Sequence, residues 1–170
     1  MTEKVRLVGD PALSTLCAEV APEQLSAEKL SPLIQSMTET MRAENGVGLA
    51  ANQIGHTIRL FILRNEDGSV SEYVNPVILG ADELVPFQGE GCLSIPGVST
   101  TTKRYNNLTL YWLDRNGKEH KQDFKGMRAF AVQHEMDHLN GKLYLDLFGP
   151  VKRDLIMRKY KKSLKQVGRK

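Results

Sequence analysis

Long apolar runs are absent from this 170-residue chain, and so is any N-terminal targeting pattern. No run reaches the length of about 20 residues that a membrane-spanning helix needs, so the sequence predicts no membrane segment. The first ten residues, MTEKVRLVGD, lack the apolar stretch of a secretory signal peptide and the arginine and serine enrichment of a transit peptide. We therefore expect a protein that stays in the cytosol where it is made.

Cysteine is also scarce. The chain has only Cys17 and Cys92, too few for a disulfide framework. In a reducing cytosol each is a thiol, and Cys17 has the surroundings of a small buried apolar residue. Internal repeats and low-complexity linkers are missing as well, and the length suits one domain. We expect a single domain over residues 1–170.

Positive charge is concentrated at one end of the chain. Residues 151–170 contain nine Lys or Arg and one Asp, a local charge of +8, whereas the whole chain carries +3 and the remaining 150 residues therefore carry −5. A basic tail on a mildly acidic body is typical of contact with a polyanion, although charge alone favours a solvated helix face.

Hydrophobic spacing predicts three helices. The first is expected from about Ser31, or a few residues earlier, to Ala43, with Ser31 as its cap and Pro32 in its first turn. The second is expected from about Met127 to Leu139, ended by Asn-Gly. The third lies in the basic tail, where one apolar stripe has helical spacing: Ile156, Tyr160, Leu164 and Val167.

Strands are expected between the first two helices. TIRLFILRN (57–65) is largely apolar, which predicts a buried strand, and SEYVNPVIL (71–79) predicts a second strand interrupted by Pro76. The runs 108–114 and 118–124 flank Arg115-Asn116-Gly117, a hairpin signal because Asn-Gly tolerates positive φ. This order predicts an α+β fold with antiparallel sheets packed around a central helix.

That central helix carries the segment QHEMDHLNG (133–141). His134 and His138 are four residues apart, so on a helix their imidazoles lie one turn apart and can converge on one ion. Glu135 lies beside them as a candidate base. Chance predicts about 0.007 H-E-x-x-H motifs for 4 His and 12 Glu in 170 residues, so the motif indicates a metal site rather than the polar side of a helix.

A catalytic metal usually has three protein ligands and one open position, so a third ligand is needed. His56 and His120 lie beside a turn and in a charged strand, where exposed residues are expected. Among acidic residues further along the chain, Asp146 and Asp154 remain alternatives. The strongest candidate is Cys92 in GEGCLSIPG, because Gly89 and Gly91 next to it allow the backbone to pass close to a bound group.

Three segments together resemble one family. GVGLAANQ (46–53), EGCLS (90–94) and QHEMDH (133–138) occur in the order and at the spacing of peptide deformylase, and the similarity runs from GDPAL near the N-terminus to the basic final helix. Peptide deformylase removes the formyl group from the N-terminal methionine of new bacterial and organellar proteins. The resemblance implies that function, a bacterial cytosol, and the family's fold with a metal-bearing helix between sheets and a C-terminal helix.

The resemblance also implies roles for individual residues. It makes Cys92, His134 and His138 the ligands of one divalent metal ion and Glu135 the general acid–base. Gln53 and the backbone N–H of Leu93 become the donors to the oxyanion. The family's physiological metal is commonly Fe²⁺, which Zn²⁺ or Ni²⁺ can replace, and we expect Fe²⁺ in the cell. A thiolate and two neutral imidazoles leave a divalent ion with a net charge of +1, so Glu135 should matter strongly.

Small residues in GVGLAA suit contact with a peptide backbone. We predict that Gly46 leaves room for the substrate and that Val47, Gly48 and Gly91 pair with it as an added strand. A simple glycine turn is the alternative, and both interpretations are compatible. The same letters superficially match a dinucleotide-binding loop, but a helix rather than a strand precedes them, so no dinucleotide is expected.

Other residues are candidates for substrate selection and ligand orientation. Phe130 and Ala131 lie one turn before the first ligating histidine and can wall a pocket for the methionine side chain, although core packing explains them equally well. Glu90 can orient a ligating histidine, and Asp137 can do so or pair with a surface cation. Ser99 stands where many family members have arginine, which bears on peptide preference rather than on metal chemistry.

The expected partners are nascent formyl-methionyl peptides and, through the basic final helix, the ribosome. Two other functions remain open. A zinc peptidase with the H-E-x-x-H motif would cut internal amide bonds, but its third ligand normally follows the motif, whereas Cys92 precedes it. A catalytically idle relative kept for binding would be expected to lose a ligand, Gln53 or Glu135, and this chain keeps them all.

Overall fold

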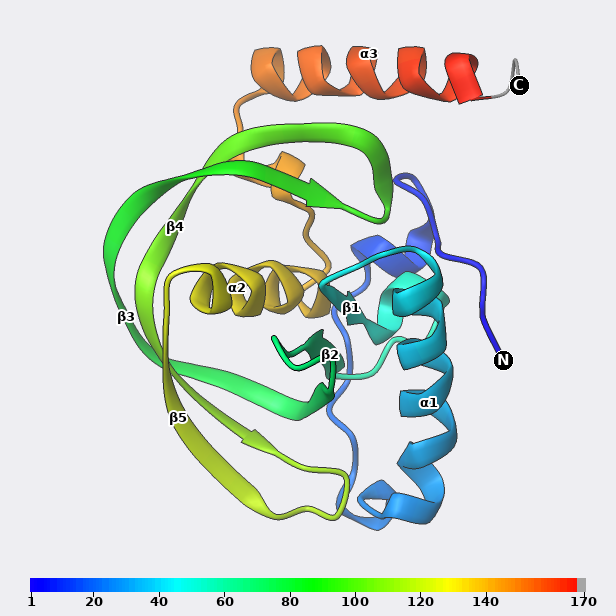
Figure 1. The fold of residues 1–170 in the computed structure, drawn as a ribbon, viewed down its shortest axis with the longest axis vertical. Coiled ribbons are helices and arrows are strands. Elements are labelled where there is room, and N and C mark those ends of the chain that lie inside the picture. Colours follow the sequence, from blue (N-terminus) through cyan, green and yellow to red (C-terminus); the bar gives the residue numbers. More distant parts are fainter. Residues whose placement is uncertain (168–170) are drawn as a thin grey trace.

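The structure is a computed structural model that describes residues 1–167 (Figure 1). Three α-helices, four 3₁₀ turns and five strands make up the described part. The helices are α1 (Ala27–Ala43), α2 (Met127–Leu139) and α3 (Pro150–Val167), and the 3₁₀ turns are η1 (Pro11–Ser14), η2 (Pro22–Gln24), η3 (Ala51–Ile54) and η4 (Tyr144–Leu147). The strands are β1 (Gly48–Ala50), β2 (Leu60–Arg64), β3 (Val70–Cys92), β4 (Ile95–Leu113) and β5 (Glu119–Lys125).

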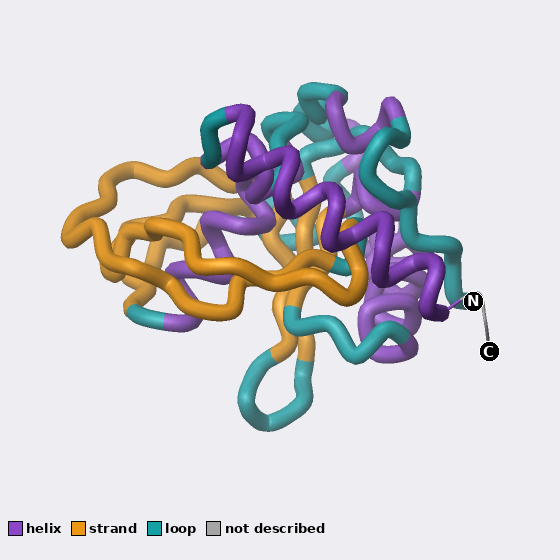
Figure 2. The backbone as a smooth tube through the Cα atoms, turned by 90° about the horizontal axis from the view of Figure 1, so that it is seen from above, coloured by secondary structure: helices purple, strands orange, loops and turns teal. Residues whose placement is uncertain are grey.

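The five strands form one antiparallel sheet in the order β1-β2-β3-β4-β5. Strands β3 and β4 are long and curl around α2, which lies inside their curve (Figure 1). Viewed from above, α3 crosses over the sheet while the β3–β4 ribbon extends to one side (Figure 2). The predicted α+β fold with a central helix and a C-terminal helix is confirmed.

Strand β2 holds the two halves of the core together because it is buried on both faces. Phe61 and Leu63 face a cluster that includes Val132 and Leu139 of α2. Leu60 and Ile62, on the opposite face, belong to a cluster with residues of α1. Alternate residues of a strand point to opposite faces, so a continuous apolar run is what a central strand requires. The predicted buried strand is therefore confirmed.

The predicted strand over 71–79 is only the first part of β3. Pro76 lies where the β3–β4 register shifts between Val74 and Val77, so it marks an irregularity and does not end the strand. Asn75 before it has a φ of 47°. A proline without an N–H is tolerated at such a bulge. The hairpin around Asn-Gly is confirmed, since Leu113 of β4 pairs with Glu119 of β5.

Helix α1 begins earlier than its predicted cap. Ser26 caps it by accepting a hydrogen bond from the N–H of Lys29, so the prediction of Ser31 as the cap is wrong. Pro32 accordingly lies inside the helix rather than in its first turn. The hydroxyl of Ser31 instead accepts a hydrogen bond from Arg115, at 3.0 Å. The helix ends at Ala43, as predicted.

Helix α3 packs on the rest of the chain through two residues of its predicted stripe. Ile156 and Tyr160 are buried in a cluster with Ile95 and residues of η4. Leu164 is 41% exposed, so the stripe does not continue there. The side chain of Val167 and residues 168–170 lie outside the described part of the chain. No helix of the described residues is long and apolar enough to span a membrane.

Candidate metal centre

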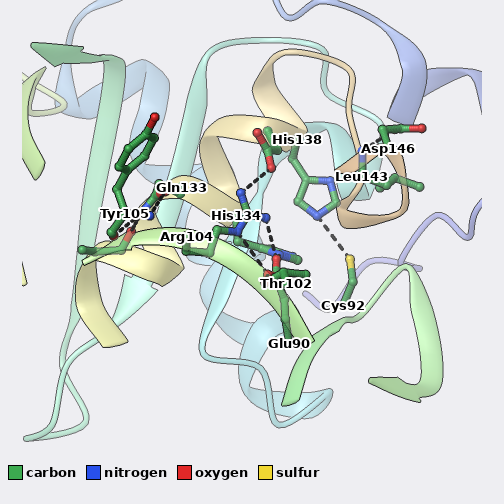
Figure 3. Close-up of polar contacts among 12 residues, drawn as sticks. Glu90, Cys92, Thr102, Arg104, Tyr105, Gln133, His134, His138, Leu143 and Asp146 are labelled. Atoms are coloured by element: carbon green, nitrogen blue, oxygen red, sulfur yellow. Dashed lines mark hydrogen bonds and ion pairs between the residues drawn. The ribbon is translucent and has the colours of Figure 1, made fainter. Parts of the chain in front are cut away.

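Cys92, His134 and His138 come together between the end of β3 and helix α2 (Figure 3). One ligand atom from each lies within 4.8 Å of the others, and Sγ of Cys92 is 3.2 Å from Nε2 of His138. The two rings come from successive turns of α2, with centroids 5.0 Å apart. The three ligands predicted from the sequence are thus brought together, in a geometry that suits a single ion.

The pKa values of the cysteine and of one histidine shift in opposite directions. Burial opposes ionisation of the Cys92 thiol, but His138 and His134 hold its pKa well below the usual range. Burial likewise opposes the charge on His134, yet its contacts with Cys92 and Glu90 raise its pKa well above the usual range. The lowered pKa of Cys92 favours the thiolate, the form in which cysteine binds metals.

Glu90 fixes the orientation of His134. Its Oε1 lies 2.7 Å from Nδ1 of His134, which leaves Nε2 for the centre. Arg104 donates two hydrogen bonds to Glu90, at 3.1 and 2.6 Å, and one to Asp137 at 2.7 Å. Thr102 also donates to Glu90 (Figure 3). Glu90 thus contacts a ligand as predicted, whereas Asp137 pairs with a buried arginine rather than with a surface cation.

Arg104 and Thr102 were missed as members of the site by reasoning from sequence. Arg104 is 4% exposed and Glu90 is 2% exposed, so their ion pair is buried. Burial works against ionisation of Glu90, but its contacts with His134 and Arg104 lower its pKa to about 2. The signal that would have found them is the pairing of β3 with β4, since alternate residues of a strand share one face of the sheet.

Glu135 is a buried carboxyl group beside the histidines. Its side chain is 3% exposed, and its Oε2 has no hydrogen-bond partner among the described residues. Burial raises its pKa to about 7, while His134 and His138 act in the opposite direction. A carboxyl group with a pKa near neutrality can both accept and donate a proton.

Gly48 makes room for this carboxyl group. A Cβ at position 48 would lie 2.3 Å from Oε1 of Glu135 and 2.7 Å from Cδ2 of Leu63, closer than atoms can approach. Gly46 is similarly restricted, because its Cβ would lie 2.9 Å from Cδ1 of Leu93. Both glycines therefore have a packing reason in addition to their predicted contact with substrate.

Gln53 reaches the centre from η3. Its Nε2 donates to Oγ of Ser94 at 3.1 Å and lies 3.6 Å from Sγ of Cys92. Its Oε1 accepts a hydrogen bond from the N–H of Ala50, so the Nε2 end of the amide faces the cysteine. Leu93 follows Cys92 directly and lines the same cavity as Gln53.

A cavity of about 840 Å³ opens onto these groups. All of the residues predicted to contact substrate line it: Gly46, Val47, Gly48, Gly91, Phe130 and Ala131. Phe87, which was not predicted, also lines it and packs on Phe130 with ring centroids 4.8 Å apart. Within the described residues β1 pairs only with β2, so the start of β1 presents an open strand edge at this cavity.

The other two histidines, His56 and His120, and the other cysteine, Cys17, are not part of the cluster. His56 is exposed, whereas His120 is half-buried, stacks on Trp112 and lies 3.2 Å from a carboxylate oxygen of Asp114. The prediction of an exposed residue thus holds for His56 and only in part for His120. Cys17 is 3% exposed, and burial raises the pKa of its thiol to about 11, so it is the small buried residue that was expected.

Comparisons with known proteins agree on one family. A family model described as polypeptide deformylase matches residues 2–154. The chain is 36% identical to a peptide deformylase of Xylella fastidiosa (strain M12) over 91% of each chain, and 38% identical to one of Syntrophobacter fumaroxidans over 92% of each. It is similar to the crystal structure of a peptide deformylase from Legionella pneumophila, with a TM-score of 0.91, 36% identity, and 100% and 99% of the two chains covered. A Met-Ala-Ser-bound peptide deformylase from Acinetobacter baumannii gives a TM-score of 0.81 at 31% identity, covering 87% of this chain and 99% of that one.

Proposed function

Because the chain belongs to the polypeptide deformylase family, we propose that Cys92, His134 and His138 bind the one metal ion that its reaction requires. The chain is a hydrolase that removes the N-formyl group from nascent polypeptides. The observation that carries the ligand assignment is the approach of a cysteine sulfur and two imidazole nitrogens to within 4.8 Å of one another.

The chemistry of these side chains supports the assignment. A thiolate and two imidazoles are ligands that Fe²⁺, Zn²⁺ and Ni²⁺ all accept. Glu90 occupies Nδ1 of His134, so only Nε2 of that ring is available to an ion. The lowered pKa of Cys92 supplies the thiolate without the need for an external base.

When bound, a divalent ion supplies a Lewis acid that polarises the formyl oxygen and lowers the pKa of water at the open position. Glu135 lies beside the two histidines that would hold the ion, and its pKa of about 7 suits proton transfer in both directions. It takes a proton from the water that attacks the formyl carbon. It then returns that proton to the amine nitrogen as the C–N bond breaks, which releases formate and a free N-terminus.

Attack on the formyl carbon places negative charge on the formyl oxygen. We assign Nε2 of Gln53 and the backbone N–H of Leu93 as the donors that stabilise this charge. Gln53 is 2% exposed and is held by Ala50 and Ser94, so it needs little reorganisation during the reaction. Loss of one such donor typically lowers kcat about 10²- to 10³-fold.

The substrate is proposed to bind as an extended chain along the cavity. Val47 directly precedes β1 and Gly48 begins it, so the two lie at the open edge of this strand, and Gly91 of β3 lines the same cavity. Strand addition of this kind derives its affinity from main-chain hydrogen bonds. Phe130 and Ala131 are assigned to the wall around the methionine side chain, with Phe87 packed behind Phe130. Gly46 keeps the mouth of this groove free of a side chain.

We assign Fe²⁺ as the metal in the cell, with Zn²⁺ or Ni²⁺ able to replace it. The general order of affinities places Zn²⁺ above Fe²⁺, so occupancy by iron depends on which ion is available when the protein folds.

Helix α3 is proposed to bring the catalytic domain, residues 1–170, to the ribosome in the bacterial cytosol. Its buried face packs on the body, while the charged side chains are exposed on its other faces: Lys152, Arg153, Arg158, Lys159, Lys161, Lys162 and Lys165. Among the described residues, Arg153 and Arg158 pair with aspartates, and the lysines form no ion pair with a carboxylate.

Formate release from formyl-Met-Ala-Ser tests the ligand assignment. We expect Cys92→Ala, reconstituted anaerobically with Fe²⁺ or Zn²⁺, to bind the ion poorly and to lose activity by at least about 10³-fold, because two ligands do not retain a catalytic ion. Cys17→Ala is the matched control, since it removes the other buried thiol and should leave activity and metal content unchanged. Full formate release by Cys92→Ala, or cleavage of internal amide bonds by the native chain, would contradict the proposal.

A further inference from the structure

Asn52 is a buried amide that the reaction above does not use. It lies in η3 directly before Gln53, and it is 0% exposed. Its Nδ2 donates to the backbone oxygen of His138 at 2.6 Å and to that of Ala12 at 3.3 Å. Its Oδ1 has no hydrogen-bond partner among the described residues, which is unfavourable for a buried polar atom. Both side-chain hydrogen bonds of Asn52 are therefore made by its nitrogen, and any role of this residue depends on them.

The carbonyl group of His138 lies in the last turn of α2, where the helix has no further N–H group to donate to it. The last four carbonyl groups of a helix lack intrahelical partners, and α2 ends at Leu139. The oxygen of Leu139 accepts from the N–H of Cys17 at 2.9 Å, and that of His138 accepts from Asn52 and from the N–H of Gly141. The last turn, which carries the His138 ring, thus accepts from the next residues of the chain, such as Gly141, and from two distant donors, Asn52 and Cys17.

The same 3₁₀ turn also contacts the cysteine side of the centre. Gln53, next to Asn52, donates to Oγ of Ser94 and touches Sγ of Cys92. Cys92 and His138 are 46 residues apart in the chain, so their approach depends on tertiary contacts. Through two consecutive side chains, η3 contacts both of the segments that carry these ligands.

We propose that Asn52 is a positioning residue that holds His138 opposite Cys92, through the bond from its Nδ2 to the His138 carbonyl oxygen, and so retains the metal ion. This inference rests on the proposed ligand set. Because partners of metal ligands typically change metal affinity 10- to 100-fold when they are removed, we expect metal release to become about 10 to 100 times faster without this bond.

Two variants remove the donor in different ways. Asn52→Leu keeps the branched shape of the side chain but has a larger volume and no donor, and Asn52→Ala shortens the side chain, so each variant decides the question if the other does not fold. Met37→Ala is the control for general destabilisation, because Met37 is 0% exposed in α1 and belongs to the cluster on the α1 side of β2, which does not include His138. The transfer of Zn²⁺ from each protein to a chelator is timed, and the thiolate-to-metal absorption band of the Co²⁺-loaded protein is recorded.

We expect both Asn52 variants to release Zn²⁺ at least about tenfold faster and to shift the cobalt band, whereas Met37→Ala does neither. Release within twofold of the native rate in the Asn52 variants would overturn the role of Asn52, as would equally fast release by Met37→Ala. The proposed ligand set would be contradicted by separate results: the native chain would bind no Zn²⁺, or Cys92→Ala would retain Zn²⁺. Neither of those results depends on position 52.

Discussion

At the scale of single residues, the centre depends on a carboxyl group that is costly to bury. Glu135 has an oxygen without a partner among the described residues, and Gly48 lies against its other oxygen where no Cβ fits. Its burial raises the pKa to about 7, which suits proton transfer but disfavours the ionised form in the folded chain. The burial that suits Glu135 for proton transfer therefore also lowers the stability of the folded chain when Glu135 is ionised.

The stability of the metal-stripped protein should show this opposition. The folded state keeps the Glu135 proton up to pH about 7, whereas the unfolded chain loses it near the ordinary value of 4.5. Stability therefore falls as pH rises from 4.5 to 7, by of order 3 kcal/mol, and the loss is complete above 7. We expect metal-stripped Glu135→Gln to be inactive on reloading, yet more stable than the native chain at pH 8 in urea unfolding, and nearly equal to it at pH 4. An equal difference at both pH values would contradict this.

Substitution of Gly48 should damage chemistry more than folding. In Gly48→Ala the new Cβ would displace the Glu135 carboxylate, and we expect kcat for formyl-Met-Ala-Ser to fall about 10²-fold or more while the bound metal is retained. Gly80→Ala is the matched control, because a Cβ at position 80 meets nothing within 4 Å. Similar kinetics for the two variants would show that the close approach at position 48 has no catalytic consequence.

At the scale of secondary-structure elements, a buried ion-pair network joins the β3–β4 ribbon to α2. Arg104 of β4 contacts Glu90 of β3 and Asp137 of α2, and Glu90 contacts His134. The side chain of Arg104 thus connects β3, β4 and α2, and through Glu90 it helps to fix the ring of His134. Removal of one partner from a buried pair is costly, because it leaves the other charge without compensation.

Acid unfolding should expose the contribution of Glu90. Its folded pKa of about 2 lies below the ordinary 4.5, so its stabilisation is fully present above pH 4.5 and is lost as pH falls toward 2. We expect Glu90→Gln to be less stable at pH 7, by of order 3 kcal/mol, and to show a flatter dependence between pH 4.5 and 2 in thermal unfolding. Glu72→Gln, which breaks the more exposed pair with Arg115, is the control and should cost less than about 1 kcal/mol. A pH dependence unchanged by Glu90→Gln would be inconsistent with this network.

At the scale of the whole molecule, the basic helix lies next to the cavity without lining it, since Ser163 of α3 donates to the backbone oxygen of Pro96, a cavity residue. Residues of β1, β3, β4 and α2 line the cavity, whereas α3 lies across the top of the molecule (Figure 1). The lysines of α3 are exposed. Charges on α3 can therefore be changed without altering the groups that line the centre.

Charge reversal on α3 should separate ribosome binding from catalysis. We expect Lys159→Glu combined with Lys162→Glu to weaken co-sedimentation with ribosomes about tenfold or more and to reduce its salt dependence, because fewer counterions are released on binding. Formate release from a short peptide should be unchanged. Lys118→Glu with Lys121→Glu, near the β4–β5 hairpin, reverses the same number of exposed charges as a control. Association that is insensitive to salt, or equally weakened in the control, would contradict a role for α3.

The local pattern of the sequence was enough to predict the two histidines of the proposed metal site, the buried strand, the Asn-Gly hairpin and the central helix. In each case the signal lies within a few residues, as with the two histidines one helical turn apart or the apolar run of β2. The middle of the β3–β4 ribbon was not predicted. Most of its residues from 79 to 106 are exposed or only half-buried, so no apolar alternation marks them as strand.

Only the tertiary structure decided which distant groups support the centre. Arg104 meets Glu90 across a strand register that shifts between Phe87 and Glu90. Gly48 meets Glu135 across 87 positions, and Asn52 bonds to His138 across 86. Side-chain type and spacing along the chain determine what chemistry a residue can perform. The close approach of residues far apart in the chain depends on how whole elements pack, and no short pattern encodes that packing.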